Sequence, residues 1–434
     1  MPPPDPSRVG TAPRQLSRRD ALKALALPVL LTGCGTRRRG TVRVAVVWSG
    51  WELTAFGRVL DGFTRTYDWN VSVLPIGDDI NALLGAQVAR SAAPDVALLP
   101  RPGLVEEYRD RIVPLGPELT APFPEPWRRL ATTSDGAVRG IWFKTAHKSM
   151  VWYRQDVFAR RRLVEPADWA GWQQVNDALA RAGESPLALG AADGWVLSDW
   201  FENVLLGLDP DGYHRLAATG RGWRAGAVSE ALRLIGEMWA APGAFPGGVD
   251  RALLTQFEES VVDVCNRGRA AMVVQGDFTY PVIGRYAAPR VRMSWFPFPA
   301  PPGGRRPVVA GGDIAVLLRG DRAGGRDLMT WLASAEAAEI WAQEGGFISV
   351  HEGVDRGVYP PIYTEALLGE VRDGMDGRIA FDLSDQLTGR LGGGDGRGLW
   401  RVLQDFLAEV AAGPGAVEAA AGRAVDTLAE YAGE

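Results

Sequence analysis

Five stretches between residues 42 and 99 decide the fold: VRVAVVW at 42–48, WELTAFGRVLDGFTRT at 51–66, VSVLPI at 71–76, INALLGAQVAR at 80–90 and PDVALL at 94–99. The first, third and fifth are short and apolar, which is typical of buried parallel strands. The second repeats its apolar side chains at helical spacing, and the fourth is the next expected helix. This alternation predicts a doubly wound α/β fold, in which ligands bind at the carboxyl ends of the strands.

The ends of the three expected strands carry polar and aromatic side chains. We expect Trp51 to be a stacking platform for a ligand, although a position on the lobe surface fits equally well. Glu52 is a candidate acceptor for ligand hydroxyls, or it favours the helix N-terminus through the macrodipole. Asp79 is a candidate ligand contact, although helix capping explains one of the two aspartates there. We expect Trp48 to pack in the core and Arg101 to lie on the surface.

Composition narrows the class of protein. The chain has 434 residues, is 46% hydrophobic and carries a formal net charge of −5, which fits two domains and argues against nucleic acid as a partner. Two cysteines exclude a disulfide framework, and three histidines without metal-ligand spacing predict no metal site. There is neither a Gly-x-Ser-x-Gly elbow nor a phosphate-binding loop, so we expect no cofactor and no catalytic residue.

The first residues have the parts of an export signal. Arg18 and Arg19 precede a short apolar run at 24–31, and Leu31-Thr32-Gly33-Cys34 follows. We expect residues 1–33 to be a twin-arginine-like signal, Cys34 to be lipidated and 34–41 to be a tether. The alternatives are a generic basic region for the arginine pair and a chance cysteine. No stretch predicts a membrane-spanning helix, so the lipid would hold the protein at the outer face of the cytoplasmic membrane.

Lysines are rare and clustered. Only three of the 47 basic residues are lysines, and Lys144 and Lys148 both lie in the segment FKTAHKS at 143–149. We expect strands at 138–143 and 150–153 on either side of this segment.

Seven segments, in order along the chain, together resemble the carbohydrate-type solute-binding proteins of bacterial ABC importers, the maltose-binding-protein-like family 1 type. They are VWSGWE at 47–52, PDVA at 94–97, KTAHKSMVWY at 144–153, AADGW at 191–195, AAMVVQGDF at 270–278, GGD at 311–313 and FDLSD at 381–385. Each segment is weak alone; the ordered set beside a lipoprotein-type signal carries the resemblance.

The resemblance implies a fold of the class II type, a periplasmic-binding-protein-like α/β fold with two hinge-linked lobes around a cleft. By that pattern the N-lobe is 42–150 plus 312–355, and the C-lobe is 151–311 plus 356–434. The lobes would close on a mono- or oligosaccharide and deliver it to membrane permease subunits, with a separate cytoplasmic ATPase. We expect the protein to be a monomer.

The resemblance also implies ligand-binding residues in the later segments. They are Lys144, His147, Trp195, Asp277, Phe278, Gly312 and Asp313. Phe347, in the stretch EGGF at 344–347, is a further candidate. A solvated charge at a strand end is the alternative for Lys144. Phe278 stands where the family often carries tryptophan, so specificity is expected to differ there.

We therefore expect a sugar-binding protein and no enzyme. One alternative is an exported glycoside-active enzyme with a carboxylate pair, because Asp and Glu are numerous. A second is a binding protein for a non-sugar solute such as a glycerophosphodiester. A third is an exported sensor or scaffold that serves no importer.

Overall fold

The computed structural model describes residues 39–77, 80–85, 93–318, 323–374, 378–392 and 398–434. The expected signal with Arg18 and Arg19, the expected lipidation site Cys34 and the candidate ligand residue Asp79 lie outside these residues. Within the described ranges, no helix combines the length and the apolar character that crossing a bilayer requires.

The first sheet contains the predicted strand–helix–strand start. Its strands are β1 (Thr41–Val46), β2 (Asn70–Pro75), β3 (Val96–Leu99), β4 (Ile141–His147), β9 (Val309–Leu317) and β10 (Ala380–Phe381). The order is β10-β9-β3-β1-β2, and β4 pairs with β9 outside this path. β1 is parallel to both β2 and β3, which confirms the doubly wound opening, whereas β9 is antiparallel to β3 and β4.

The second sheet is smaller and begins directly after β4. Its strands are β5 (Met150–Arg154), β6 (Ser185–Ala188), β7 (Ala270–Val274) and β8 (Met293–Pro297), in the order β6-β7-β5-β8. β5 is antiparallel to both neighbours, and β6 is parallel to β7. The chain is thus a mixed α/β protein with two separate sheets, as predicted.

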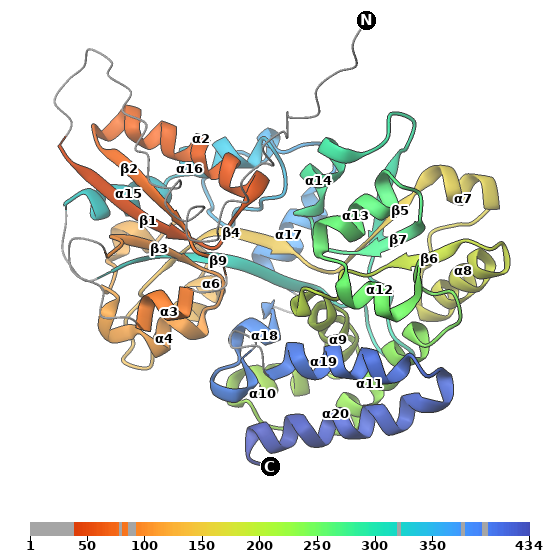
Figure 1. Ribbon diagram of the computed structural model, residues 1–434. Helices are drawn as coiled ribbons and strands as arrows, with labels where there is room; N and C mark the ends of the chain where they lie inside the picture. The colour runs from red at the N-terminus through yellow and green to blue at the C-terminus, as the bar shows by residue number, and fades with distance from the viewer. Residues whose placement is uncertain (1–38, 78–79, 86–92, 319–322, 375–377, 393–397) are drawn as a thin grey trace, which may run out of the picture. The chain divides into compact units, whose positions relative to one another are not determined.

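Helices surround both sheets (Figure 1). Two stretches of the chain, before β5 and between β9 and residue 342, contain the helices α2 (Gly50–Tyr67), α3 (Ile80–Gly85), α4 (Gly103–Glu107), α5 (Pro117–Thr120), α6 (Glu125–Leu130), α15 (Ala323–Leu332) and α16 (Ala335–Ala342). The others are α7 (Gln155–Arg161), α8 (Trp169–Arg181), α9 (Gly194–Leu208), α10 (Pro210–Thr219), α11 (Gly226–Trp239), α12 (Gly248–Leu254), α13 (Phe257–Cys265), α14 (Thr279–Tyr286), α17 (Glu365–Asp373), α18 (Leu383–Gln386), α19 (Gly398–Val410) and α20 (Val417–Ala432). Helices α9, α11, α19 and α20 pack on one another.

Two apolar clusters form the core. One is built around the first sheet, where Trp48, Phe56 and Trp341 pack edge to face. The other is built around β5, β7 and the α9–α11–α19–α20 helices, and its centre holds Trp172 stacked on Trp200 with ring centroids 5.2 Å apart. Large buried aromatic side chains stabilise both clusters, and β5 contributes alternate residues to each of them: Met150 and Trp152 to the first, Val151 and Tyr153 to the second.

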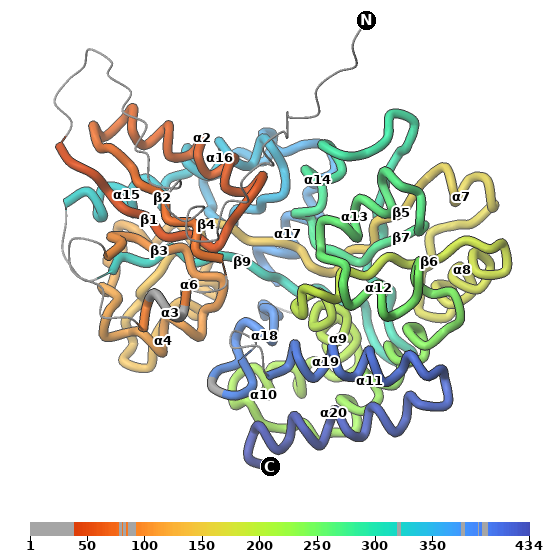
Figure 2. Tube along the Cα trace, viewed as in Figure 1, coloured from red at the N-terminus to blue at the C-terminus, as the bar shows by residue number. Residues whose placement is uncertain are grey.

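The chain passes between the two sheets where β4 continues into β5 and where β8 leads to β9 (Figure 2). The expected strand at 138–143 is corrected here, because β4 runs from Ile141 to His147. It extends past residue 143 because β9 pairs with it from Ala315 to Ala310. Lys144 is therefore part of a strand, opposite Asp313, and Lys148 follows the strand's last residue.

Candidate functional site

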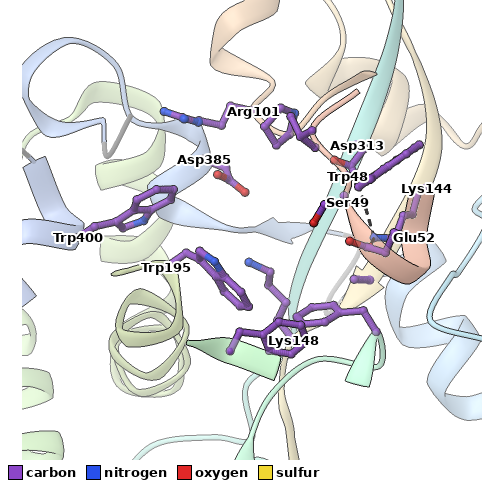
Figure 3. Close-up of a pocket in the computed structure, with 16 residues that line it drawn as sticks. Trp48, Ser49, Glu52, Arg101, Lys144, Lys148, Trp195, Asp313, Asp385 and Trp400 are labelled. Atoms are coloured by element: carbon purple, nitrogen blue, oxygen red, sulfur yellow. Dashed lines mark hydrogen bonds and ion pairs between the residues drawn. The ribbon is translucent and has the colours of Figure 1, made fainter. Parts of the chain in front are cut away.

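A cavity of about 260 Å³ is lined by strands of the first sheet and by helices and loops on both sides of it in the chain (Figure 3). The first sheet and its loops supply Val47, Trp48, Ser49, Glu52, Pro100, Arg101, Lys144, Ala146, Gly312 and Asp313. Lys148, Trp195, Phe257, Phe278, Asp385 and Trp400 complete the lining. Val47 to Ser49 and Pro100 to Arg101 follow the carboxyl ends of β1 and β3, which is where ligands bind in such sheets.

Lys144 is the centre of a charged cluster on one wall. Its Nζ donates to Glu52 Oε1 and lies 3.7 Å from Asp313 Oδ2. The Trp48 indole Nε1 also donates to Asp313 Oδ2, at 3.1 Å. Lys144 thus fixes two carboxylates from different elements, α2 and β9, at the edge of the cavity.

Burial shifts the titration of this cluster. It raises the pKa of Asp313 to about 6, although the Lys144 ammonium acts in the opposite direction. Burial would lower the pKa of Lys144, but Glu52 and Asp313 outweigh it, and the pKa of Lys144 is raised. The lysine therefore stays charged at neutral pH, and the wall presents both donors and acceptors to a ligand.

Lys148 is held by a second set of carboxylates. Its Nζ donates to Asp199 Oδ1 at 3.0 Å and also to Asp382 Oδ2. The ammonium lies 5.5 Å from the ring centroid of Trp195, within the range of a cation–π interaction. Asp199 and Asp382 outweigh the effect of burial and raise the pKa of Lys148 well above its usual value.

Aromatic rings form another part of the lining. Trp195, Phe257 and Phe278 contact one another with ring centroids 5.4 to 5.8 Å apart. Trp195 is the second residue of α9, and Phe257 is the first of α13, so helix starts direct both rings toward the cavity. A sugar ring offers an apolar face to such a surface and hydroxyls to the charged groups around it.

Six of the predicted ligand residues line the cavity. They are Glu52, Lys144, Trp195, Phe278, Gly312 and Asp313. They come from α2, β4, β9, the start of α9 and the residue before α14, so the structure brings together segments that are far apart in the sequence.

Four other predicted residues lie outside the lining. Trp51 packs edge to face on Trp341, with centroids 6.1 Å apart. Phe347 is fully buried and stacks on the same Trp341 ring at 5.2 Å. These two rings belong to the first core cluster and its margin rather than to the cavity.

His147 and Asp277 are buried together behind the cavity. Asp277 Oδ1 accepts the backbone N–H of His147 at 2.8 Å, and its Oδ2 accepts the Tyr363 hydroxyl at 3.1 Å. His147 Nε2 is 3.0 Å from Glu370 Oε2. These contacts tie β4 to the loop before α14 and to α17, so both residues support the cavity's frame.

The sequence interpretation missed several lining residues. Trp48 was expected only in the core and Arg101 on the surface, yet both line the cavity while being buried. Arg101 and Asp385 had a usable signal, since one follows a strand end and the other lies in a segment that carries the resemblance. No sequence signal identified Phe257 or Trp400, because both are aromatic residues on amphipathic helices, where such residues are expected in the core.

Among the described residues, no group of three or more His, Cys, Asp or Glu side chains is arranged so that it could hold a metal ion.

Two α/β halves, each with its own sheet, that line a common cavity define a two-lobed periplasmic binding protein. The chain belongs to the family of bacterial extracellular solute-binding proteins, whose profile matches residues 59–366. This is a family of binding proteins, and membership confirms the predicted class.

Relatives and solved structures agree with this family. The osmoprotective compounds-binding protein GgtB of Synechocystis sp. is 29% identical over 403 residues, 87% of this chain and 93% of that protein. The alpha-glucosides-binding periplasmic protein AglE of Rhizobium meliloti is 26% identical over 350 residues, 74% of each chain. The structure of the solute-binding protein RafE in complex with raffinose matches with a TM-score of 0.70 at 13% identity, over 90% of this chain and 99% of that one, and shares the fold.

Proposed function

We propose that this chain is the substrate-binding lipoprotein of a carbohydrate ABC importer. It binds a mono- or oligosaccharide in the cavity and delivers the sugar to a membrane permease pair, which a separate cytoplasmic ATPase drives. It acts without catalysis, as a monomer, through affinity and lobe closure.

The observation that carries this proposal is the make-up of the cavity. The rings of Trp195 and Phe278 line the same cavity as the acceptors Glu52 and Asp313 and the donor Lys144, whose Nζ lies 6.0 Å from the Phe278 ring centroid. Sugars need this combination, because their hydroxyls require planar acceptors and donors while their C–H faces require aromatic surface. One relative and one structural neighbour support the same class: the relative is an alpha-glucosides-binding protein, and the neighbour was solved with raffinose.

Direct binding tests the proposal. Purified protein without residues 1–33 is screened by thermal shift against neutral and acidic sugars, a glycerophosphodiester, a peptide and a polyamine, and hits are measured by calorimetry. We expect a sugar to raise the melting temperature, because a ligand of the folded state stabilises it by mass action. If no sugar does so and a peptide or polyamine does, the substrate class is wrong.

Absence of catalysis has its own test. The protein is incubated with the oligosaccharides that it binds, and reducing ends are measured over time. We expect none to be released; turnover that is lost when Glu52 or Asp385 becomes the corresponding amide would favour the glycoside-active alternative.

Membrane attachment is proposed to depend on Cys34. In the producing cell, Cys34→Ser is expected to move the protein from the membrane fraction to the medium or periplasm and to abolish labelling by a radioactive fatty acid. Substitution of the other cysteine, Cys265→Ser, is the matched control, because Cys265 is a buried thiol. A Cys34→Ser protein that remains lipid-labelled and membrane-bound would contradict this proposal.

A further inference from the structure

Arg101 differs from the other buried cations of the protein. In the described part of the chain, the buried lysine and arginine side chains are Arg101, Arg139, Lys144 and Lys148. Arg139 forms an ion pair with Asp135, and each lysine has two carboxylate partners. Arg101 is 4% exposed and forms no ion pair with any described residue. Its Nε and Nη2 are shielded from solvent and have no hydrogen-bond acceptor among those residues.

The two unsatisfied nitrogens lie on the same edge of the guanidinium. This edge is the one that binds both oxygens of a carboxylate in a fork. Elsewhere in the chain the same pair of nitrogens does this repeatedly, in the pairs Arg129–Glu125, Arg154–Asp156, Arg233–Glu230 and Arg372–Asp373. The Arg101 edge therefore has the form of a carboxylate site for which no described residue supplies the acid.

The surroundings of Arg101 place this edge at one end of the cavity. The guanidinium carbon lies 5.5 Å from the ring centroid of Trp400, and Asp385 lies on the same side, away from Lys144 and Glu52 (Figure 3). Trp400 holds the guanidinium plane but supplies no acceptor. No ion pair joins Arg101 to Asp385, whose backbone N–H donates to Asp382 Oδ1.

A buried cation without an anion is costly. Removing one partner of a buried pair costs more than the pair itself contributes, because the remaining charge is left without compensation. Neutral hydroxyls would satisfy the two N–H groups but would leave the charge, whereas a carboxylate satisfies both. Burial and the Asp382 carboxylate raise the pKa of Asp385 well above its usual value, although the Lys148 and Arg101 charges act in the opposite direction; this weakens both its compensation of Arg101 and its repulsion of an incoming anion.

We propose that the solute of this protein carries a carboxylate, and that Arg101 binds it with Nε and Nη2 beside Trp400. The proposal rests on the proposed function and narrows it: the ligand is an acidic sugar or a glycoside with an acidic aglycone, with its neutral ring between Trp195 and the Lys144 wall.

Matched pairs of ligands test this. Glucose is compared with glucuronate, galactose with galacturonate, and maltose with maltobionate, by calorimetry at pH 7.5 for the parent, Arg101→Gln and Arg101→Lys. We expect the acid of at least one pair to bind the parent at least tenfold more tightly than its neutral partner. Arg101→Gln is expected to remove that preference, and Arg101→Lys to recover only part of it, because an ammonium lacks the fork.

A second readout needs no ligand. Unliganded Arg101→Gln is expected to melt no lower than the parent, because the substitution removes an uncompensated buried charge. Arg139→Gln, which breaks the paired buried arginine, is the matched control and is expected to melt lower.

The outcomes separate the two proposals. If neutral sugars bind as tightly as their acids and Arg101→Gln weakens both equally, the carboxylate inference is wrong and the sugar-binding proposal stands. If no sugar of either kind binds, both are wrong. A clear drop in the melting temperature of unliganded Arg101→Gln, as large as that of Arg139→Gln, would also overturn the inference, since it would mean that the charge is already compensated.

Discussion

Alternate residues of β4, and Lys148 directly after it, have different tasks. Lys144, Ala146 and Lys148 line the cavity, whereas Thr145 donates its hydroxyl to the Ile348 carbonyl and His147 contacts Glu370 on the other side. Successive side chains of a strand point to opposite faces, so residues 144 and 147 cannot both face the cavity along one regular strand. Once β4 is known to reach His147, the period of two selects Lys144 with Lys148 and removes His147 from the wall.

Trp195 is the residue on which we expect ligand affinity to depend most. Its partly exposed ring stands over the cavity between Phe257 and Phe278. Trp195→Ala is expected to weaken sugar binding by about 1–3 kcal/mol, because the apolar sugar face loses its platform. Calorimetry with the best sugar of the screen measures this.

Trp200 gives the matched control for this prediction. It lies in the same helix but is fully buried and stacked on Trp172. Trp200→Ala is expected to lower the free energy of unfolding by about 3–5 kcal/mol through a core cavity. Trp195→Ala should leave that quantity nearly unchanged. If Trp195→Ala binds as the parent does, Trp195 does not contact the ligand.

At the level of the elements, the pairing of β4 with β9 places Lys144 and Asp313 side by side in the cavity lining. Thr145 lies opposite Gly312, and Lys144 opposite Asp313. A Cβ at Gly312 would lie 3.0 Å from Thr145 Cα and closer still to the Lys144 carbonyl oxygen. The glycine is therefore needed for the close approach of the two strands.

Gly312→Ala is expected to cost about 1–3 kcal/mol of stability, because backbone atoms cannot move aside as a flexible side chain would. It should also weaken sugar binding, since it displaces the strand that carries Lys144. Gly57→Ala in α2 is the control: a Cβ there meets nothing within 4 Å, and we expect it to stabilise the protein by about 0.5–1 kcal/mol. Urea unfolding of both variants decides; equal stability of Gly312→Ala and the parent would contradict the prediction.

Much of the architecture could be predicted from local pattern. The apolar runs at 42–48, 71–76 and 94–99 become β1, β2 and β3, and the rule for strand ends locates Glu52 and also Arg101. The local sequence pattern did not predict the end of β4, because pairing with a distant strand determines it. Whether β4 ends at 143 or 147 depends on β9, more than 160 residues further along the chain.

Residues that reach the cavity from late helices were beyond local pattern for the same reason. Trp400 belongs to an amphipathic helix whose buried face is mostly core, and no periodicity distinguishes its ring from Phe406 in the same helix. The predicted lobe bounds, 42–150 with 312–355 and 151–311 with 356–434, also stay a prediction. Residues 359–371 belong to the predicted C-lobe, yet their apolar side chains join the cluster around the first sheet.

Across the whole molecule, buried acids are held between opposing effects. Burial raises the pKa of Asp277 to about 6, against the His147 backbone N–H and the Lys144 charge, which lower it. Glu370 shows the reverse result: burial raises its pKa, but His147 and Arg306 outweigh burial and bring the value to about 2. Burial also lowers the pKa of His214 to about 4. Stability at a given pH depends on which of these groups gains protons in the folded chain.

Asp277 is expected to make the folded protein more stable as the pH falls. Its folded pKa lies above the unfolded value of 3.8, so between about pH 7 and 4 the folded chain takes up a proton that the unfolded chain does not. Relative to Asp277→Asn, the parent should therefore gain about 1 kcal/mol of unfolding free energy between pH 7.5 and 5.

The contribution of His214 to stability changes in the opposite direction, because the unfolded chain takes up its proton at a higher pH than the folded chain does. Relative to His214→Gln, the parent should lose stability between pH 7.5 and 5. Urea titrations of the three unliganded proteins at both pH values measure these differences. Parallel changes in all three would mean that neither group titrates differently in the folded and unfolded chains.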